Sequence, residues 1–383
     1  MPAAQTPKRP VSYDKQVALV LQGGGALGSY QAGAYEALAQ SEYVPDWVAG
    51  VSIGGINAAI IAGNPPPERV GRLRDFWETV TASSSEWPMI PGAFFDEMHR
   101  RAAALSALLL GQPGFFKPWD PLEWFSGDMP ASYYDTSALR RTLERLIDFD
   151  RINARETRLS ISAVNVETCE LVHFDNVEMT IRPEHVLAST ALPPGFPAVE
   201  IDGARYWDGG LVSNTPLQYV LSYYPRRSRL TFQIDLFPSS GTSPRTIEDV
   251  WERAKDIRYS SRTRAGTDHL RAMHDIRHNL NLLFESLPDS LKTSPAAAFL
   301  SEIACVTTMD IAQVIYRPEN MQGPAKDYEF SRLSMQRRWP QGMADAQALL
   351  DLSPWLEPSP ATTGVRVFEM NPAPAATGAA HSR

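Results

Sequence analysis

Cysteine is nearly absent from this sequence. The chain has 383 residues and two cysteines, Cys169 and Cys305, which stand far apart and form no C-x-x-C pair. This excludes a disulfide framework of the kind that holds small secreted domains together, and we expect no cysteine-based zinc site. The pattern is typical of a reduced, intracellular protein, so we predict a cytoplasmic location.

Long apolar segments are also missing. The longest run without a charged residue, 47–67, contains Ser52, Asn57, several glycines and three consecutive prolines. It does not resemble the helix of about 20 apolar residues that crosses a bilayer. The first sixteen residues are polar, with Lys8 and Arg9 but no apolar stretch after them, so we expect no signal peptide. Peripheral contact with the inner face of the membrane is the remaining expectation.

Positive charge is not in excess either. Lysine and arginine number 36 against 44 aspartates and glutamates, which gives a net charge of −8. A surface of that sign repels a phosphate backbone, so we expect no nucleic acid partner. The length allows one large domain or two ordinary ones, and composition does not indicate an oligomeric state.

The sequence does contain a regular alternation of strands and helices. Residues 17–21 predict a buried strand, 29–40 an alanine-rich helix, 46–51 a second strand and 56–62 a second helix. This β-α-β-α order is typical of a parallel sheet with covering helices. Further strands are expected at 158–166, 170–174, 199–201, 204–207 and 230–236, and helices at 69–80, 137–147 and 183–190. We therefore predict an α/β fold, a three-layer α/β/α sandwich with a mainly parallel central sheet.

Composition changes along the chain and predicts four parts. After residue 240 the sequence becomes charged and mainly helical, with one further apolar strand expected within 304–316. From residue 353 it is rich in proline, alanine and threonine, which is typical of disorder. The predicted parts are a flexible tail at 1–15, an α/β domain at 16–240, C-terminal helices at 241–352 and a disordered tail at 353–383.

Residues 102–110 predict a short apolar helix with two open interpretations. Leu105, Leu108 and Leu109 form a stripe, with alanines beside it. Such a stripe is typical of a core helix. The aromatic residues nearby also fit the wall or lid of an apolar substrate channel; they are Phe94, Phe95, Phe115, Phe116, Trp119, Trp124 and Phe125.

The segment from Gly50 to Gly54 reads G-x-S-x-G, which is typical of a nucleophile elbow. A strained turn between strand and helix pushes the Ser52 hydroxyl into a cleft. The chain then passes so close to itself that Gly50 and Gly54 stand where a Cβ atom would collide. This pattern makes Ser52 the candidate nucleophile.

A run of glycines follows the first predicted strand. Gly23, Gly25 and Gly28 match G-x-G-x-x-G, the dinucleotide fingerprint, but that fingerprint requires an acidic residue at the end of the second strand, where Ser52 stands. The backbone N–H groups of Gly23, Gly24 and Gly25 also suit the oxyanion of a tetrahedral intermediate, because they lie at a helix N-terminus. A purely structural tight turn is the third interpretation.

A nucleophilic serine needs a base, and two types are available. Ser52, Asp208 and then His269, His274 or His278 follow the order of an α/β-hydrolase triad. Only about two strands precede Ser52, however, which fits that fold poorly. The three histidines also lie in a charged helix, where a solvated face is the plain interpretation, and His274 and His278 lack a third metal ligand.

Asp208 ends a predicted hairpin, and Gly209 and Gly210 allow the chain to turn sharply behind it. By composition alone, Asp-Gly-Gly is a common turn, so a structural Asx-turn is the alternative to a catalytic carboxylate.

Three of these motifs, taken in order, resemble the patatin-like phospholipase family. They are Gly23–Gly28, Gly50–Gly54 and Asp208–Gly210, and the segment 191–197 that leads to the last one also resembles that family. The resemblance covers residues 16–236. It implies a Ser52–Asp208 dyad without histidine, and acyl-ester hydrolysis on lipids of the phospholipase A or lysophospholipase kind through an acyl-enzyme. It implies no cofactor and no metal, and gives Gly28, Gly50, Gly54, Gly209 and Gly210 supporting roles.

One position departs from the family pattern. Leu27 stands where the family often has arginine or lysine before the last glycine, so this loop brings no cation to the oxyanion. A non-catalytic lipid-binding protein of the same fold is the alternative, and the intact Ser52 and Asp208 argue against it. Head group, chain length and positional preference are not predicted.

Overall fold

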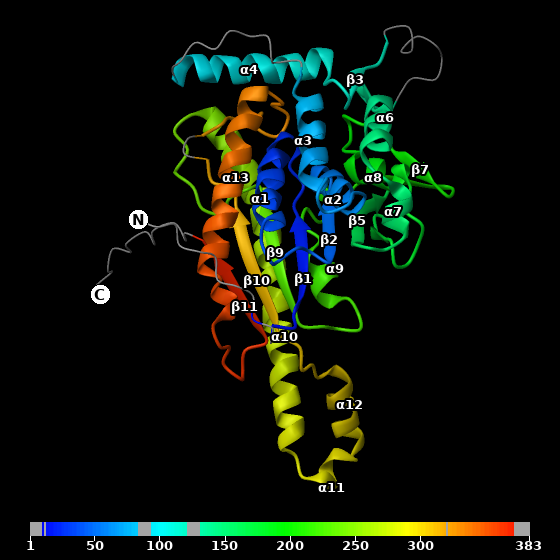
Figure 1. The fold of residues 1–383 in the computed structure, drawn as a ribbon, viewed down its shortest axis with the longest axis vertical. Helices are drawn as coiled ribbons and strands as arrows, with labels where there is room; N and C mark the ends of the chain where they lie inside the picture. The colour runs from blue at the N-terminus through cyan, green and yellow to red at the C-terminus, as the bar shows by residue number, and fades with distance from the viewer. Residues whose placement is uncertain (1–9, 11–12, 83–92, 121–130, 319–320, 371–383) are drawn as a thin grey trace, which may run out of the picture.

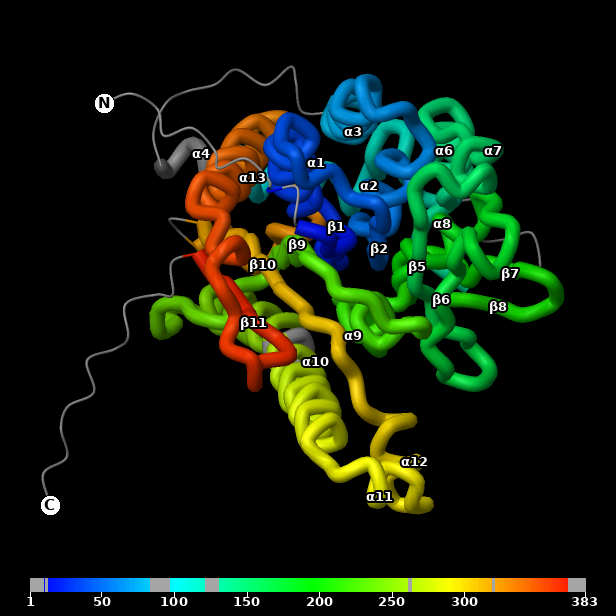
Figure 2. The backbone as a smooth tube through the Cα atoms, turned by 60° about the horizontal axis from the view of Figure 1, so that its bottom comes forward, coloured from blue at the N-terminus to red at the C-terminus, as the bar shows by residue number. Residues whose placement is uncertain are grey.

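The computed structural model describes residues 10, 13–82, 93–120, 131–318 and 321–370. Its centre is a nine-stranded sheet in the order β11-β10-β9-β1-β2-β5-β8-β7, with β6 paired to β5. Figure 1 labels most of these strands, and Figure 2 labels β6 and β8. The strands are β1 Gln16–Leu21, β2 Trp47–Val51, β5 Arg158–Asn165, β6 Leu171–Asp175, β7 Val199–Ile201, β8 Ala204–Asp208, β9 Arg229–Asp235, β10 Met309–Ile315 and β11 Val365–Glu369. The short strands β3 Lys117–Pro118 and β4 Tyr134–Asp135 form a separate pair.

The six strands from β11 to β5 are parallel, and β6, β7 and β8 are antiparallel to their neighbours. All residues of β2 and β9 are buried, because helices cover both faces of this part of the sheet. The predicted α/β fold with a mainly parallel sheet is confirmed.

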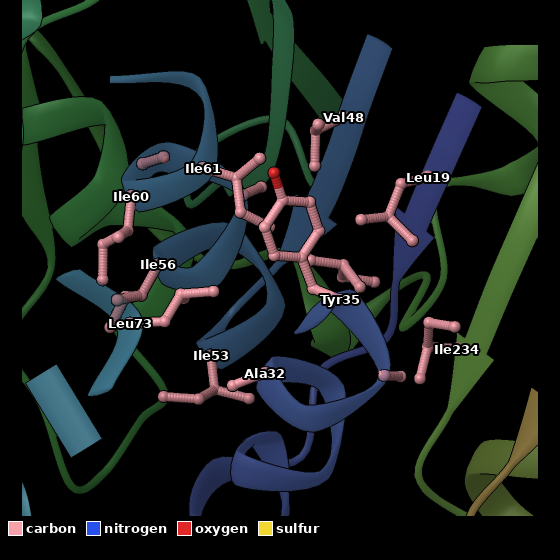
Figure 3. Packing of buried hydrophobic residues seen from close by; sticks show 14 of the residues in the cluster. Leu19, Ala32, Tyr35, Val48, Ile53, Ile56, Ile60, Ile61, Leu73 and Ile234 are labelled. Atoms are coloured by element: carbon pink, nitrogen blue, oxygen red, sulfur yellow. The ribbon is translucent and has the colours of Figure 1, made fainter. Parts of the chain in front are cut away.

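Two apolar cores lie on the two faces of the sheet, and alternate residues of β1 point to each. Val17, Leu19 and Leu21 face the larger core, whereas Ala18 and Val20 face the smaller one. Figure 3 shows part of the larger core, where Leu19 and Val48 from the strands meet side chains from the covering helices.

Different helices cover the two faces (Figure 2). The larger core is covered by α1 Ser29–Ala39, α2 Ile53–Ala62, α3 Arg69–Val80, α6 Ser137–Leu146, α7 Phe149–Asn153, α8 Pro183–Thr190 and α13 Arg332–Leu352. The smaller core is covered by α9 Leu217–Ser222 and the middle of α10 Ile247–Ser286. The predicted helices at 69–80 and 183–190 are confirmed with the same bounds.

The C-terminal region is part of the sheet as well as helical. The strand expected within 304–316 is confirmed as β10, which pairs with β9. Residues 353–370 are ordered, so the predicted disordered tail is wrong for them: Trp355 is buried in η4 Pro354–Leu356, and β11 adds to the sheet through β10. The rest of that tail, 371–383, and most of the predicted N-terminal tail lie outside the described residues.

A helical arm projects from one end of the molecule. It consists of the second half of α10 together with α11 Asp289–Lys292 and α12 Pro295–Ile303 (Figure 1). Leu283 and Phe299 are exposed on it.

Helix α4, Ala93–Leu110, lies at the other end, beyond the carboxyl edge of the parallel strands (Figure 1). Leu105, Leu108 and Leu109 are 56%, 44% and 64% exposed, whereas Ala104 and Ala107 are buried. The interpretation as a core helix is therefore wrong, because the large side chains face outward. The side chains of Phe94 and Phe95, and residues 121–130 with Trp124 and Phe125, lie outside the described part. No described helix is both long and apolar enough to cross a bilayer.

Candidate active site

Ser52 occupies a strained turn between β2 and α2. Its φ and ψ are 56° and −127°, a conformation that side-chain-bearing residues rarely adopt. The turn is tight enough to require glycine on both sides: a Cβ at Gly50 would lie 2.2 Å from the Gly54 carbonyl oxygen, and one at Gly54 would lie 2.4 Å from that of Leu21. The half-buried Ser52 side chain therefore has the geometry of a nucleophile elbow at the N-terminus of α2.

Asp208 ends β8 beside Ser52. The register pairs Asp208 with Ala163 of β5, and Val51 with Ser162 of the same strand, which brings the end of β8 next to the end of β2. The Ser52 hydroxyl lies close enough to the Asp208 carboxylate to lower its pKa. The structure thus joins two residues that are far apart in the sequence.

The Asp208 carboxylate is 2% exposed. Burial raises its pKa to about 6, against the opposing effects of the nearby Ser52 hydroxyl and of the hydrogen bond from the Gly210 N–H. The Gly210 N–H donates to Oδ1 at 2.7 Å, which is the Asx-turn that the Asp-Gly-Gly pattern predicts. The turn and the contact with Ser52 occur together, so the two interpretations of Asp208 do not exclude each other.

Gly209 and Gly210 make that turn compact. A Cβ at Gly209 would lie 2.6 Å from the Ser162 carbonyl oxygen, and one at Gly210 would lie 2.8 Å from the Asn214 side-chain oxygen. Substitution at either position would push the Asp208 turn away from its neighbours.

The glycine loop follows β1 at the same edge of the sheet. A Cβ at Gly23 would lie 3.2 Å from the Ser52 Cβ, so the loop and the elbow are in contact. The Gly23 N–H, however, donates to the Asn214 carbonyl oxygen at 3.0 Å. This corrects the prediction for Gly23: its N–H is already bonded within the protein. The N–H groups of Gly24 and Gly25 donate to no acceptor in the described part of the chain.

Gly28, at the end of this loop, packs closely against the residue that follows Ser52. A Cβ there would lie 2.7 Å from the Ile53 side chain and 2.9 Å from Trp77. Leu27 is fully buried in the larger core, which is the physical reason that an apolar residue fits this position.

Three polar residues that the motifs do not include hold the site together. The Asn214 side chain donates to the Gly23 carbonyl oxygen at 2.8 Å, and the Ser189 hydroxyl accepts the Ser52 N–H at 3.0 Å. Asn57 donates to the Gly28 carbonyl oxygen at 3.0 Å. A buried asparagine in an otherwise apolar helix was a signal for Asn57, but the local sequence around Ser189 and Asn214 carries none.

Two of the histidines proposed for a triad bind elsewhere. His274 contacts the Thr307 carbonyl oxygen at 2.9 Å, and His278 contacts that of Ala361 at 2.9 Å. Thr307 precedes β10, so His274 lies at the amino edge of the parallel strands, whereas Ser52 lies at their carboxyl edge. His269 is exposed on α10. No cluster of three or more histidine, cysteine, aspartate or glutamate side chains in the described ranges is arranged to hold a metal ion.

A cavity of about 700 Å³ adjoins this edge of the molecule. Its walls are α4, the first turns of α10 and the segment 321–329, and Ala104, Leu105 and Leu108 line it. The segment 321–329 also reaches the glycine loop, since a Cβ at Gly25 would lie 2.0 Å from the Asp327 carbonyl oxygen. The segment 321–329 therefore lies between this cavity and the glycine loop.

Two family models match different parts of the chain. A family model described as patatin-like phospholipase matches residues 19–221, and a second one, described as patatin phospholipase, matches 257–362. A patatin-like phospholipase domain-containing protein of Caenorhabditis elegans, M110.7, is 39% identical over 61 residues. That stretch is 16% of this chain and 6% of the C. elegans protein.

Solved structures similar to this chain are much less alike in sequence. VipD from Legionella pneumophila is 12% identical, with 88% of this chain and 67% of that chain covered and a TM-score of 0.38. The type III effector ExoU of Pseudomonas aeruginosa is 14% identical, with 90% and 54% covered and a TM-score of 0.33. Human GIVD cytosolic phospholipase A2 is 12% identical, with 88% and 60% covered and a TM-score of 0.33.

Proposed function

This chain belongs to the patatin-like phospholipase family, a family of lipid hydrolases, and we propose that it is a serine acyl hydrolase that cleaves lipid esters with Ser52 and Asp208. The observation that carries the proposal is the position of the Ser52 hydroxyl, on a strained elbow, close to the buried Asp208 carboxylate. A nucleophile, a base in contact with it and free N–H donors nearby are the parts that acyl transfer requires.

In the first step, the Ser52 oxygen attacks the ester carbonyl carbon while its proton passes to Asp208. The carbonyl oxygen becomes an oxyanion, and the Gly24 and Gly25 N–H groups are the donors proposed to bind it. The N-terminus of α2, which begins directly after Ser52, adds a favourable partial positive charge. Each oxyanion donor of this kind typically lowers the barrier by about 3–4 kcal/mol.

The tetrahedral intermediate collapses when the Asp208 proton is given to the leaving alcohol, and an acyl-serine ester remains. Water then attacks that ester, with Asp208 again accepting a proton and returning it to Ser52 as the fatty acid leaves. Asp208 therefore starts and ends each half-reaction as a carboxylate. Its raised pKa, about 6, makes it a stronger base than an exposed aspartate while it stays largely ionised at neutral pH.

The dyad is tested by comparing wild type with Ser52→Ala and Asp208→Asn on short and long p-nitrophenyl esters. We expect both variants to lose at least about 10³-fold in kcat, because loss of a nucleophile or its base removes the chemical step. Asp202→Asn is the matched control: Asp202 lies in the turn between β7 and β8 and its side chain is 76% exposed. Equal activity in wild type, Ser52→Ala and Asp208→Asn would contradict the proposed function.

The exposed face of α4 supports a proposal about how the lipid arrives. Leu109 and Leu110, which do not line the cavity, are exposed at the end of this helix, and Trp251 of α10 is exposed as well. An ion pair between Arg101 and Glu248, 2.7 Å long, links the two helices. We propose that this apolar face rests on the surface of a bilayer, so that an acyl chain passes from the lipid into the cavity beneath α4.

The docking proposal is tested by flotation with phosphatidylcholine vesicles. The double variant Leu109→Ser/Leu110→Ser, at residues that do not line the cavity, is expected to bind vesicles at least about 100-fold more weakly, because each leucine removed from water contributes roughly 1.5–3 kcal/mol. Its hydrolysis of a soluble short ester should not change. Leu283→Ser/Phe299→Ser on the helical arm is the control, with exposed apolar residues at the opposite end of the molecule. Equal loss of binding in the two double variants would contradict a specific docking face.

A further inference from the structure

Residues of the C-terminal region form hydrogen bonds with the glycine loop at Ala26, one residue after the proposed donors. The Ala26 N–H donates to the Asp327 carbonyl oxygen at 2.7 Å. On the other side, the Ala26 carbonyl oxygen accepts a hydrogen bond from Nη1 of Arg338 at 3.1 Å. Both peptide groups that flank Ala26 are thus fixed by residues about 300 positions later in the chain.

Arg338 is an arginine in the interior of the protein. It lies on α13 and is 2% exposed. Its other hydrogen bonds go to the Glu329 carboxylate at 3.3 Å, the Gln322 side-chain oxygen at 3.1 Å, and the carbonyl oxygens of Lys326 and Glu329, each at 3.4 Å. The guanidinium therefore joins three parts of the molecule: α13, the segment 322–329 and the glycine loop.

The same segment is anchored from behind on α10. Lys326 is buried between Glu252 and Asp256, at 3.1 and 2.5 Å. Lys255 bonds the Asp327 carboxylate at 2.6 Å and the Pro324 carbonyl oxygen at 2.7 Å. The backbone at Asp327 is consequently held in place by the ionic contacts of the Lys326 and Asp327 side chains.

A loop of three consecutive glycines needs such support. Glycine has the widest range of backbone conformations, so the loop by itself does not specify the direction of its N–H groups. Gly25 has φ of +55°, and its backbone lies directly against the Asp327 carbonyl. Contacts from outside the loop are therefore what selects a single conformation.

We propose that Arg338 is a positioning residue for the oxyanion loop, which sets the orientation of the Gly24 and Gly25 N–H groups through its bond to Ala26. The proposal rests on the function proposed above for Ser52 and these glycines. The glycine loop has no cation of its own, because Leu27 stands at that position. Arg338 on α13 brings a positive charge to the loop instead and donates a hydrogen bond to its backbone. Arg338 holds the donors in place without contacting the substrate.

The experiment compares Arg338→Met and Arg338→Lys with two controls. Arg337→Met changes the exposed neighbour on the same helix. Glu329→Gln weakens the same buried ion pair but leaves the contact between Arg338 and Ala26. For each variant, kcat and KM on a p-nitrophenyl ester and the midpoint of thermal unfolding are measured.

We expect Arg338→Met to lower kcat by about 10- to 100-fold with little change in KM, because misplaced donors weaken binding of the transition state more than that of the substrate. Arg338→Lys should recover part of the loss. Arg337→Met should match wild type, and Glu329→Gln should lower the unfolding midpoint while keeping most of kcat.

A folded Arg338→Met variant with wild-type kcat would overturn the inference. An equal loss of kcat in Glu329→Gln and Arg338→Met, at the same unfolding midpoint, would also overturn it. If Arg338→Met does not fold, the kcat and unfolding midpoint of Arg338→Lys are compared with those of wild type and the controls instead. Ser52→Ala in the same assay separates the two proposals: activity equal to wild type defeats the function itself, whereas an inactive Ser52→Ala beside a fully active Arg338→Met defeats only the role of Arg338.

Discussion

Residues 16–235 and 245–370 contribute to the candidate site in opposite ways. The first region holds Ser52, Asp208 and the glycine loop, each within a short pattern that includes glycine. The second region has no such pattern, yet its α13 and the segment 322–329 hold the loop through buried ionic and backbone contacts. Reacting groups are marked locally by the strain around them, whereas the groups that position them are recognised only from long-range contacts.

The largest expected effect comes from breaking the contact between the two regions at Gly25. In Gly25→Ala the new Cβ would lie 2.0 Å from the Asp327 carbonyl oxygen, at a φ of +55°. We expect kcat/KM on a p-nitrophenyl ester to fall by at least about 100-fold, because the loop must move away from Ser52.

Gly203→Ala is the matched control for this substitution. Gly203 also has a positive φ, of +84°, but no atom lies within 4 Å of its Cβ position. It should lower the free energy of unfolding by about 1–3 kcal/mol and leave activity unchanged. Similar activity in the two variants would mean that the contact with Asp327 has no part in catalysis.

The next effect separates two buried carboxylates. Asp208 must be ionised to accept a proton, and burial raises its pKa to about 6. The value of kcat/KM should therefore be constant well above pH 6 and fall about tenfold per pH unit below it. Burial also raises the pKa of Asp235, to about 7, at the end of β9.

Asp235→Asn should leave this pH profile unchanged, as measured by ester hydrolysis from pH 4.5 to 8.5. If the fall in kcat/KM at low pH disappears in Asp235→Asn, the ionisation belongs to Asp235 and not to Asp208, which would contradict our account. A fall centred near pH 4 would mean that burial does not tune Asp208.

A smaller effect is expected where the C-terminal support is partly exposed. Lys255→Met removes the bonds to Asp327 and to the Pro324 carbonyl oxygen but leaves Arg338 in place. A loss of roughly fivefold in kcat is expected, since a partly exposed ion pair contributes about 1 kcal/mol. Lys292→Met, on the helical arm, should have no effect on kcat. A kcat loss in Lys255→Met greater than that in Arg338→Met would reverse the order of importance that we assign.

The smallest effect is expected at the histidines of α10. His269→Ala, His274→Ala and His278→Ala should each keep ester hydrolysis within about twofold of wild type, because none of them is bonded to Ser52 or Asp208. His274→Ala should lower the unfolding temperature most, since His274 is buried. A loss as large as that of Asp208→Asn in any of them would replace the dyad with a triad.

Much of the first region could be predicted from the sequence, because apolar periodicity and glycine patterns are local. Helices α3 and α8 have the predicted bounds. The strand β11 was not predicted, since five residues within a segment rich in proline and threonine become a strand only by pairing with β10. The stripe on α4 did not reveal which side faces the protein, since leucine and alanine are both apolar.

The candidate site shows the same limit. The pairing of Gly23 with Asn214, and of Ala26 with Arg338, joins residues separated by about 190 and 310 positions. No local pattern marks Asn214, Ser189 or Arg338, because each is an ordinary polar residue whose role depends on what lies opposite in the fold. Sequence therefore marked the loop that contacts the elbow, but not that the Gly23 N–H is already bonded to Asn214.

The central claim is that Ser52 is a nucleophile activated by Asp208, and reaction with a fluorophosphonate tests it most directly. The protein and its Asp208→Asn variant are incubated with the probe, and the adduct is followed by intact-mass and peptide mass spectrometry. Our account predicts a single adduct on Ser52, formed at least about 100-fold more slowly in Asp208→Asn. Labelling at another residue, or equal rates in the two proteins, would contradict it.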